Sequence, residues 1–583
     1  GHESGFTRDG RPFWVAGTTG GNLTAVDISD PREPVQVFEQ TGVRYHGLRL
    51  SRDGRTMYVA VTGGSQGAMS TAGLRVLDVS EVQDRRPDPD VSVISDLTWQ
   101  TVSIPQSAEP FTRGGRHYLL ETDEYADYQG DQEIGAARII DIEDPKRPRV
   151  VSDLRLAVHE AGFGSGEQAL DPGALIPVQG YASHYCSVPY VKNPKIVACS
   201  MILSGLRIFD ISDLSRPMQV GAVQTCRGSH THSVVAGPTP DGKILVYNSG
   251  TGRVREEEEL DQCIDDIPGD DRTALFRIDV IEIPVDDPSQ SRIIDSPAVF
   301  ADPETGVLAG LWRGGDHGDD TQETNRTDQC HDITVFPSAN LAAGACSGNG
   351  ILFDITDPRK PTRIDVVTDS GFAYWHSATF NNEGTKVLFT DEWGGGGRAR
   401  CRAWDPLTWG ADAIYDIVDD KLEFRSHYKM PAPQLETENC VAHNGSIVPV
   451  PGRDIFVQAW YQGGISVIDF TDSSNPLEIA YFDRGPILED ELITGGYWSV
   501  YYYEGTIYGT EITRGLDVLK LIPSEYLSAN EIAAAAMAYP VIGPRRFNPQ
   551  QQVPMTWPAA PEVAGAYIDQ LLRDNAIAED AAE

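Results

Sequence analysis

The sequence predicts an all-β protein folded as a single β-propeller, and two observations carry this prediction. One short phrase of alternating β-branched and apolar residues, ending in a turn rich in Asp and Ser, recurs along most of the 583 residues. The copies lie about 50 to 75 residues apart, which leaves room for about four short strands in each repeat, and such sheets arranged radially form a propeller. We count nine possible repeats. We expect seven to nine blades, with eight favoured, followed by a short α-helical tail.

The recurring phrase has the composition of a strand that enters a tight turn. Its clearest copies are Leu23-Thr-Ala-Val-Asp-Ile-Ser-Asp-Pro, Gly205-Leu-Arg-Ile-Phe-Asp-Ile-Ser-Asp, Gly350-Ile-Leu-Phe-Asp-Ile-Thr-Asp-Pro and Gly464-Ile-Ser-Val-Ile-Asp-Phe-Thr-Asp. The phrase resembles the defining repeat of the LVIVD-repeat family, and the resemblance extends over residues 1 to about 522. It implies the propeller fold, but it says little about function because propellers carry many chemistries.

The chain changes character after residue 522, so we divide it into a propeller at 1–522 and a tail at 523–583. Ser528 and Glu531 have the spacing of a capping box ahead of an Ala-rich helix. A Pro-rich passage follows, and a second helix with an apolar face is expected at 562–575. We expect this tail to pack on the propeller.

Composition excludes several classes of function. The chain has 47 Lys and Arg against 86 Asp and Glu, and its formal net charge is −39. A nucleic-acid-binding protein needs a basic surface, and so does a protein that sits on anionic lipid. No apolar run approaches the roughly 20 residues of a membrane-spanning helix. We therefore expect a small-molecule substrate, no nucleic-acid partner and no membrane insertion, and the sequence leaves the oligomeric state open.

The eight cysteines are placed as if they were paired. Two pairs flank turn candidates at equal distances, which sets their members opposite one another across a hairpin. Two further pairs would fasten long loops to the starts of inner strands. The expected disulfides are Cys186–Cys199, Cys330–Cys346, Cys226–Cys263 and Cys401–Cys440. Four disulfides predict a secreted, extracellular or periplasmic protein, and the alternative is a cytosolic protein with eight buried thiols.

Histidine recurs at one position of the repeat, the start of the innermost strand. Seven of the nine repeats carry it there, although the whole chain has only twelve histidines. These residues are His2, His46, His184, His232, His331, His376 and His443, and the exceptions are Gln100 and Ser499. Because the inner strands begin at one mouth of the central channel, we expect these side chains to converge there.

Several imidazoles around one axis are typical of a transition-metal site. Three or four would bind the ion and the rest would line the channel. The candidate ligands are His46, His184, His232, His331, His376 and His443, and the candidate lining residues are His2, Gln100, Ser499 and His230. We expect one ion, with Cu or Fe favoured over Zn or Mn. The alternative is a water-filled channel whose histidines hydrogen-bond the neighbouring blade.

Carboxylates end the second strand of three repeats and should rim the same mouth. They stand in Thr122-Asp-Glu-Tyr125, Thr390-Asp-Glu-Trp393 and Thr510-Glu511. Near a metal, a carboxylate can bind it, orient a histidine or act as general base. The catalytic candidates are Glu124, Glu392 and Glu511, and the candidates for substrate contact are Trp375, Trp393 and Tyr125. The alternative is a Thr-Asp turn that caps a loop. Ca²⁺ is an additional candidate ligand of the acidic loop at 250–272.

Histidines and carboxylates together predict a secreted metal-dependent enzyme that acts on a small organic substrate. The chain is also distantly similar to the selenium-binding and methanethiol oxidase family of multi-histidine propellers, which implies copper-dependent oxidation. An oxidoreductase is therefore the first expectation. The alternatives are a metal-dependent lyase or hydrolase with a saccharide-type substrate, and a non-catalytic propeller that binds protein or glycan. No phosphate-binding loop or dinucleotide fingerprint is present in the sequence, which argues against nucleotide chemistry.

Overall fold

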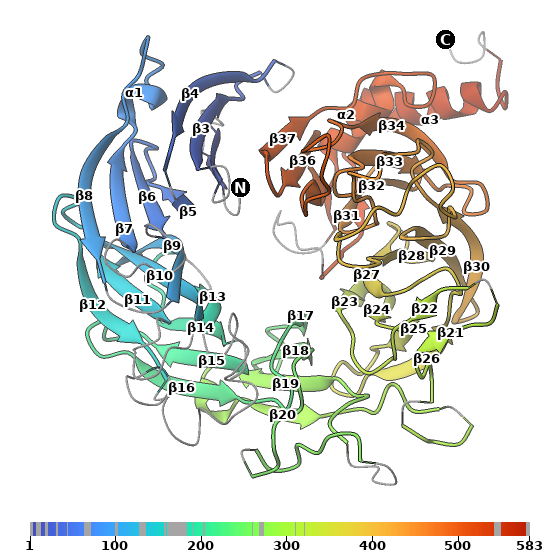
Figure 1. Cartoon of the computed structure of the whole chain (residues 1–583), viewed down its shortest axis with the longest axis horizontal. Coiled ribbons are helices and arrows are strands. Elements are labelled where there is room, and N and C mark those ends of the chain that lie inside the picture. Colours follow the sequence, from blue (N-terminus) through green and yellow to red (C-terminus); the bar gives the residue numbers. More distant parts are fainter. Residues whose placement is uncertain are drawn as a thin grey trace.

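The structure is a computed structural model of the whole chain, built almost entirely from antiparallel β-sheets (Figure 1). It describes residues 4–6, 13–17, 21–30, 33–43, 45–62, 72–99, 103–126, 136–156, 159, 183–188, 191–201, 205–258, 260–267, 273–302, 304–308, 310–319, 321–541 and 550–578. Nine sheets follow one another in chain order around a common centre (Figure 1), and we number them blades 1 to 9. The β-propeller prediction is therefore confirmed.

The described strands give eight blades of four strands and a last blade of three. Nine blades lie at the upper end of the expected range, and the favoured number of eight is one too low. The second strand of blade 1, β2, contacts the third strand of blade 9, β37, so the first and last blades meet.

The strand bounds follow the sequence repeats. Blades 1 to 4 consist of β1 (Ser4–Phe6), β2 (Phe13–Gly17), β3 (Asn22–Asp27), β4 (Val35–Thr41), β5 (Tyr45–Leu50), β6 (Thr56–Val61), β7 (Gly73–Asp78), β8 (Ser92–Thr98), β9 (Ser103–Arg113), β10 (Arg116–Ala126), β11 (Ala137–Asp141), β12 (Arg149–Leu154), β13 (Ser183–Ser187), β14 (Ile196–Met201), β15 (Gly205–Asp210) and β16 (Met218–Val223). Blades 5 to 9 consist of β17 (Thr231–Ala236), β18 (Lys243–Ser249), β19 (Asp279–Pro284), β20 (Arg292–Asp295), β23 (Asp332–Phe336), β24 (Leu341–Cys346), β25 (Asn349–Asp354), β26 (Thr362–Val367), β27 (Trp375–Phe380), β28 (Lys386–Asp391), β29 (Asp412–Val418), β30 (Lys421–Tyr428), β31 (Gly445–Val448), β32 (Ile455–Ala459), β33 (Ile465–Asp469), β34 (Leu477–Phe482), β35 (Tyr497–Tyr503), β36 (Thr506–Glu511) and β37 (Gly515–Leu519).

The recurring phrase forms the third strand of each blade, and its terminal Asp makes the turn. The Asp carboxylate accepts the backbone N–H two residues further on, which reverses the chain toward the fourth strand. This contact recurs as Asp27 with Ser29 (2.7 Å), Asp210 with Ser212 (2.6 Å), Asp354 with Thr356 (2.8 Å) and Asp469 with Thr471 (3.0 Å). In these blades the phrase therefore ends the third strand by a local hydrogen bond of the same kind.

The first strands of successive blades contact one another, as seen for the series β17, β23, β27, β31 and β35. They therefore line the centre of the ring, and their starting ends lie next to one another. Apolar clusters fill the space between neighbouring blades and pack against their inner strands.

All four expected disulfides are present, and the described residues include no free cysteine. Cys186 and Cys199 are direct register partners on β13 and β14, as the symmetric spacing about their turn predicted. Cys401–Cys440 ties the loop after β28 to the segment before β31. Four disulfides are consistent with an extracellular or periplasmic location.

The C-terminal segment lies against blades 6 to 8. It contains α2 (Ala529–Met537) and α3 (Pro561–Arg573), and a capping box at Ser528 and Glu531 begins α2. Trp557 donates a hydrogen bond from Nε1 to the carbonyl of Pro449 at 2.9 Å. The remaining short elements are α1 (Ser80–Gln83), the 3₁₀ turns Pro288–Gln290 and Pro337–Ala339, and the two-residue strands β21 (Gly315–Asp316), β22 (Glu323–Thr324), β38 (Tyr539–Pro540) and β39 (Met555–Thr556). No described helix is long and apolar enough to cross a membrane.

Candidate metal centre

Backbone hydrogen bonds define the histidine position in blades 5, 6 and 8. His230, His331 and His443 each donate their N–H to the end of the neighbouring second strand, over 2.9, 2.9 and 3.1 Å. His230 therefore occupies the repeat position in blade 5. The assignment of this position to His232 from the sequence is wrong. His232 lies two residues further along and is exposed. The sequence did not separate the two histidines because residues two apart share one face of a strand.

Strand register corrects the position in blade 9 as well. The residue before His376 pairs with Asp391, and the residue before Trp498 pairs with Glu511 in the same way. Trp498 is thus the equivalent of His376, and the assignment to Ser499 is wrong by one residue. Both strands have a register shift directly after this pair, and such bulges defeat a strict two-residue alignment.

Rings from blades 5 to 9 stand side by side in one row. The ring centroids are 4.3 Å apart for His230 and His331, and 4.0 Å apart for His331 and His376. They are 4.3 Å apart for His376 and His443, and 4.4 Å for His443 and Trp498. The structure therefore brings three of the six candidate ligands together and adds His230 to them.

A carboxylate from the end of β28 reaches two of these rings. Glu392 Oε2 lies 3.5 Å from Nε2 of His376, and Oε1 lies 3.6 Å from Nε2 of His443. The hydroxyl of Tyr461 donates a hydrogen bond to Oε1 and so fixes the carboxylate. One donor atom from each of Glu392, His376 and His443 lies within 4.8 Å of the others, which is a spacing that could hold a metal ion.

A second carboxylate lies beside His331. Asp332 Oδ1 is 3.4 Å from Nδ1 of His331, and it accepts a hydrogen bond from the Thr231 hydroxyl at 3.0 Å. The donor atoms of His331, Asp332 and His376 also lie within 4.8 Å of one another. His376 therefore belongs to two potential ligand groups.

Burial sets the protonation states of the cluster. Desolvation and the neighbouring histidines hold the pKa of His376 well below its usual value, and burial lowers the pKa of His443 to about 3. Burial also opposes a charge on His331, but the Asp332 carboxylate outweighs it and raises the pKa of His331. Burial raises the pKa of Glu392. Neutral imidazoles such as His376 and His443 are the form that binds metals.

Some ring nitrogens of the cluster have no hydrogen-bond partner among the described residues. Nδ1 of His376 is such an atom, and so are both ring nitrogens of His443. The two side chains are only 2% and 1% exposed, so water does not solvate them freely. Buried polar atoms are nearly always satisfied, because leaving one unpaired costs free energy. A bound cation would satisfy these nitrogens.

Other predicted site residues lie elsewhere or serve the backbone. His46 occupies the expected position in blade 2, but its Nδ1 lies 2.9 Å from the carbonyl of Pro105 in blade 3, which is the neighbouring-blade contact of the alternative interpretation. His184 is in register in blade 4. The side chains of His184, Glu124 and Tyr125 lie outside the described residues, as do His2 and Gln100.

The carboxylates that end the second strands differ in role, because some bind backbone N–H groups and one reaches the histidines. Asp391 accepts three backbone N–H bonds, which anchor the start of β27 and thereby position His376; the donors are Ala373, Tyr374 and Gly410 at 3.1, 2.9 and 2.9 Å. Glu511 does the same in blade 9, accepting from Gly496 (2.6 Å), Thr513 (2.9 Å) and Arg514. The catalytic assignment of Glu511 therefore gives way to the loop-capping alternative. Of the catalytic candidates whose side chains are described, Glu392 is the one that reaches the histidine row, which consists of His230, His331, His376 and His443.

One of the two described candidates for substrate contact differs from expectation. Trp375 is fully buried, with its ring 4.7 Å from that of Phe372, so it is a core residue and the prediction of substrate contact is wrong. Trp393 is partly exposed and packs edge-on against Trp409 at 4.2 Å. The guanidinium of Arg400 lies 3.9 Å from the centre of the Trp393 ring. Substrate contact by Trp393 stays a prediction.

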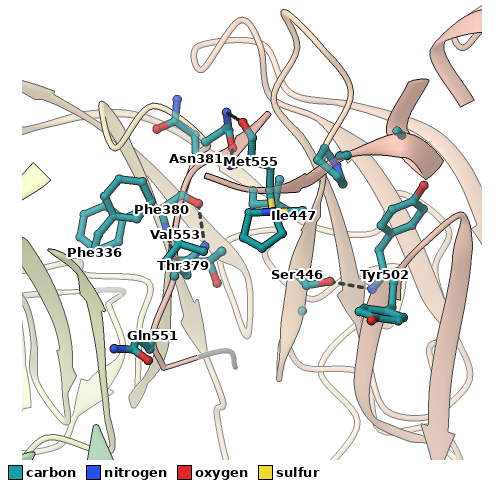
Figure 2. Close-up of a pocket in the computed structure, with 18 of the residues that line it drawn as sticks. Phe336, Thr379, Phe380, Asn381, Ser446, Ile447, Tyr502, Gln551, Val553 and Met555 are labelled. Atoms are coloured by element: carbon teal, nitrogen blue, oxygen red, sulfur yellow. Dashed lines mark hydrogen bonds between the residues drawn. The ribbon is translucent and has the colours of Figure 1, made fainter. Parts of the chain in front are cut away.

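Sequence reasoning missed Asp332 and Trp498 as members of the site. Asp332 directly follows a histidine of the repeat position, which is a signal that could have drawn attention to it. Trp498 was hidden by the register error at Ser499. The sequence also gave no sign of a cavity of about 960 Å³, open mouth included, at the finishing ends of the inner strands (Figure 2). Phe380, Ile447 and the tail residue Val553 line it, and none of the predicted site residues does.

Two segments match the LVIVD repeat, residues 14–41 and 203–225. These matches fall on the second to fourth strands of blade 1 and on the outer strands of blade 4, and they confirm the resemblance seen in the sequence. Similarity to the selenium-binding and methanethiol oxidase family stays a prediction. No curated protein matches this chain.

Solved propellers resemble the chain in fold. The Dos1 propeller is 11% identical with a TM-score of 0.40, covering 81% of this chain and 91% of its own. BamB from Moraxella catarrhalis is 8% identical with a TM-score of 0.36, covering 88% and 92%. The periplasmic gluconolactonase of Pseudomonas aeruginosa is 15% identical with a TM-score of 0.32, covering 63% and 85%. At these values the likenesses carry no argument about function.

Proposed function

We propose that the chain is a metal-dependent enzyme whose centre is formed by His376, His443 and Glu392 at the mouth of the channel. The observation that supports this most directly is the pair of buried neutral histidines with unpartnered nitrogens beside one carboxylate. Two imidazoles and a carboxylate form the donor set of non-haem Fe(II) oxygenases and of several catalytic zinc sites. The donors include no thiolate or thioether, the ligands that select Cu(I).

Oxidation of a small organic substrate is the first reaction class that we propose. Glu392 would then be a ligand, held in place by Tyr461, and dioxygen would be the electron acceptor. The substrate loses two electrons and two protons, and dioxygen takes them up as hydrogen peroxide. The four disulfides support an extracellular or periplasmic setting for this reaction.

Hydrolysis or elimination is the second candidate, and Glu392 itself favours it. Burial raises the pKa of this carboxyl, which moves it toward the range of a general base. With Zn or Mn bound by the histidines, Glu392 would accept a proton from the attacking water instead of binding the ion. The bound metal would supply Lewis-acid activation.

Elemental analysis of protein purified without chelators or affinity nickel tests the proposal. We expect stoichiometric metal in the wild type and in His46→Ala, and its loss in a His376→Ala/His443→Ala double variant that retains the wild-type circular dichroism. Iron or copper would direct substrate screening to oxidations, and zinc or manganese to hydrolysis and elimination. Absence of metal after reconstitution with each of these ions would overturn the proposal. Ca²⁺ binding by the loop at 250–272 remains a separate prediction for the same analysis.

A further inference from the structure

The histidine row has a two-sided arrangement about His376. On one side His443 lies at a ring distance of 4.3 Å with Glu392 between the two nitrogens, and on the other side His331 lies at 4.0 Å with Asp332 beside it. In each group the donor atoms lie within 4.8 Å of one another, and His376 is the member that both groups share.

Each side has its own carboxylate, and a hydroxyl group fixes each of them. The Tyr461 hydroxyl donates to Glu392, and the Thr231 hydroxyl donates to Asp332 at 3.0 Å. Tyr461 follows β32 in blade 8, whereas Thr231 begins β17 in blade 5, so the two carboxylates are held by opposite ends of the row. This duplication of histidine, carboxylate and hydroxyl exceeds what a single ion needs.

The two ring nitrogens of His376 are available to different sides. Nε2 lies 3.5 Å from Glu392, which assigns it to the group with His443. Nδ1 is buried and has no hydrogen-bond partner among the described residues. It is the nitrogen left for the group of His331 and Asp332.

We propose that the row is a two-cation centre in which His376 bridges two divalent transition-metal ions. One ion is bound by His376, His443 and Glu392, and the second by His376, His331 and Asp332. Because an imidazole that binds through both nitrogens must lose its N–H proton, binding of the second ion releases one proton from His376 to solvent. This inference rests on the proposed function and adds a second ion to the same site.

Titration of the metal-free full-length protein with Cu²⁺ tests the bridge, with electron paramagnetic resonance as the readout. We expect two ions per chain, and loss of most of the signal at the second equivalent because two Cu²⁺ ions joined by one imidazolate couple magnetically. Asp332→Asn should bind one ion with a full signal, and so should His443→Gln. His46→Gln, in another part of the ring, is the matched control and should behave as the wild type.

The outcomes separate this inference from the proposed function. One ion per chain, lost on His443→Gln but kept on Asp332→Asn, would overturn the second site and leave the proposed function intact. Two ions with independent, uncoupled signals would overturn the bridging role of His376. Failure to bind Cu²⁺ or any other of the proposed metals would overturn both.

Discussion

The two ends of the inner strand β27 differ in whether their polar atoms have hydrogen-bond partners. At its start, His376 is buried with Nδ1 unpartnered, and other histidines surround it. At its finish, the backbone N–H and carbonyl of Phe380 are both satisfied by the tail residue Gln552, at 2.8 and 3.1 Å. The start carries unsatisfied, titratable groups, whereas the finish is hydrogen-bonded and covered by apolar side chains and the tail.

This difference indicates what each end is for. An unpartnered buried nitrogen destabilises the fold, so its retention favours a ligand that satisfies it. The finishing end of β27 shows the reverse pattern, since the N–H and carbonyl of Phe380 are both paired within the chain. We therefore propose that the starting ends of the inner strands serve function and the finishing ends serve stability, and each prediction below tests one side of that division.

The largest expected effect is on metal binding by the starting end. His376→Ala removes the residue shared by both ligand groups, so we expect metal affinity to fall by more than about 100-fold, and activity with it. Isothermal titration with the metal found in the wild type measures this. We expect the variant to fold, because it removes a polar ring whose burial costs desolvation free energy.

The matched control is His46→Ala, which removes a histidine at the same repeat position in blade 2. Its Nδ1 is already engaged by the Pro105 carbonyl, so we expect unchanged metal content and a loss of about 1 kcal/mol in unfolding free energy. If His46→Ala lost as much metal as His376→Ala, the metal site would not be confined to the blades that carry His376 and its neighbours.

The next effect concerns the tail. Glu531 is fully buried and pairs with Arg453 (2.9 Å) and with Arg573. Glu531→Gln keeps the shape and the helix cap but replaces the charged partner of Arg573 with a neutral one, while Arg453 keeps its ion pair with Asp469. We expect a loss of about 2 to 4 kcal/mol in urea unfolding at pH 7. Metal content should not change.

The pH dependence of this pair has a definite sign. Burial alone would raise the pKa of Glu531, but Arg573 and Arg453 outweigh it and hold the pKa below its usual value. A carboxyl with a lowered folded pKa stabilises the protein fully above its ordinary value of 4.5, and that stabilisation is lost as the pH falls further. The difference between wild type and Glu531→Gln should therefore shrink below about pH 4.5; a constant difference would argue against the ion pair.

Much of the fold could be predicted because the repeat is a local signal. In most copies the terminal Asp of the phrase makes a turn with a residue two positions away, and these copies mark the end of a third strand. The disulfide Cys186–Cys199 could be predicted for the same reason, since a hairpin sets residues equidistant from its turn opposite one another. The number of blades could not, because it depends on how the first and last repeats meet.

The site could be predicted only in part. The recurrence of histidine located the mouth of the channel, but a bulge at the start of β35 shifted the register at Trp498. His230 was missed because it shares one face of its strand with His232. Which histidines form a site depends on their neighbours in space. Asp332 and Glu392 reach the row in blades 6 and 7, whereas in blade 2 a backbone carbonyl takes the nitrogen of His46. Such contacts between blades cannot be predicted from a repeat pattern along the sequence.

Tyr461→Phe should have a smaller effect on the starting end. It removes the hydroxyl that fixes Glu392 while keeping the ring 5.3 Å from that of His443. We expect metal affinity to fall about 10-fold, because groups that orient a ligand have effects of this size. Competition with a chromogenic chelator measures the change. An effect as large as that of His376→Ala would make Tyr461 a ligand in its own right.

The smallest effect is expected at the finishing end. Gln552→Ala removes both hydrogen bonds to the Phe380 backbone, and water from the adjoining cavity can replace part of them, so we expect a loss of about 1 kcal/mol in unfolding free energy. Hydrogen exchange should show faster exchange of the Phe380 amide with no change at the histidine end of β27. If Gln552→Ala lowered metal affinity, the two ends of the strand would be coupled, and the division between a functional and a structural end would fail.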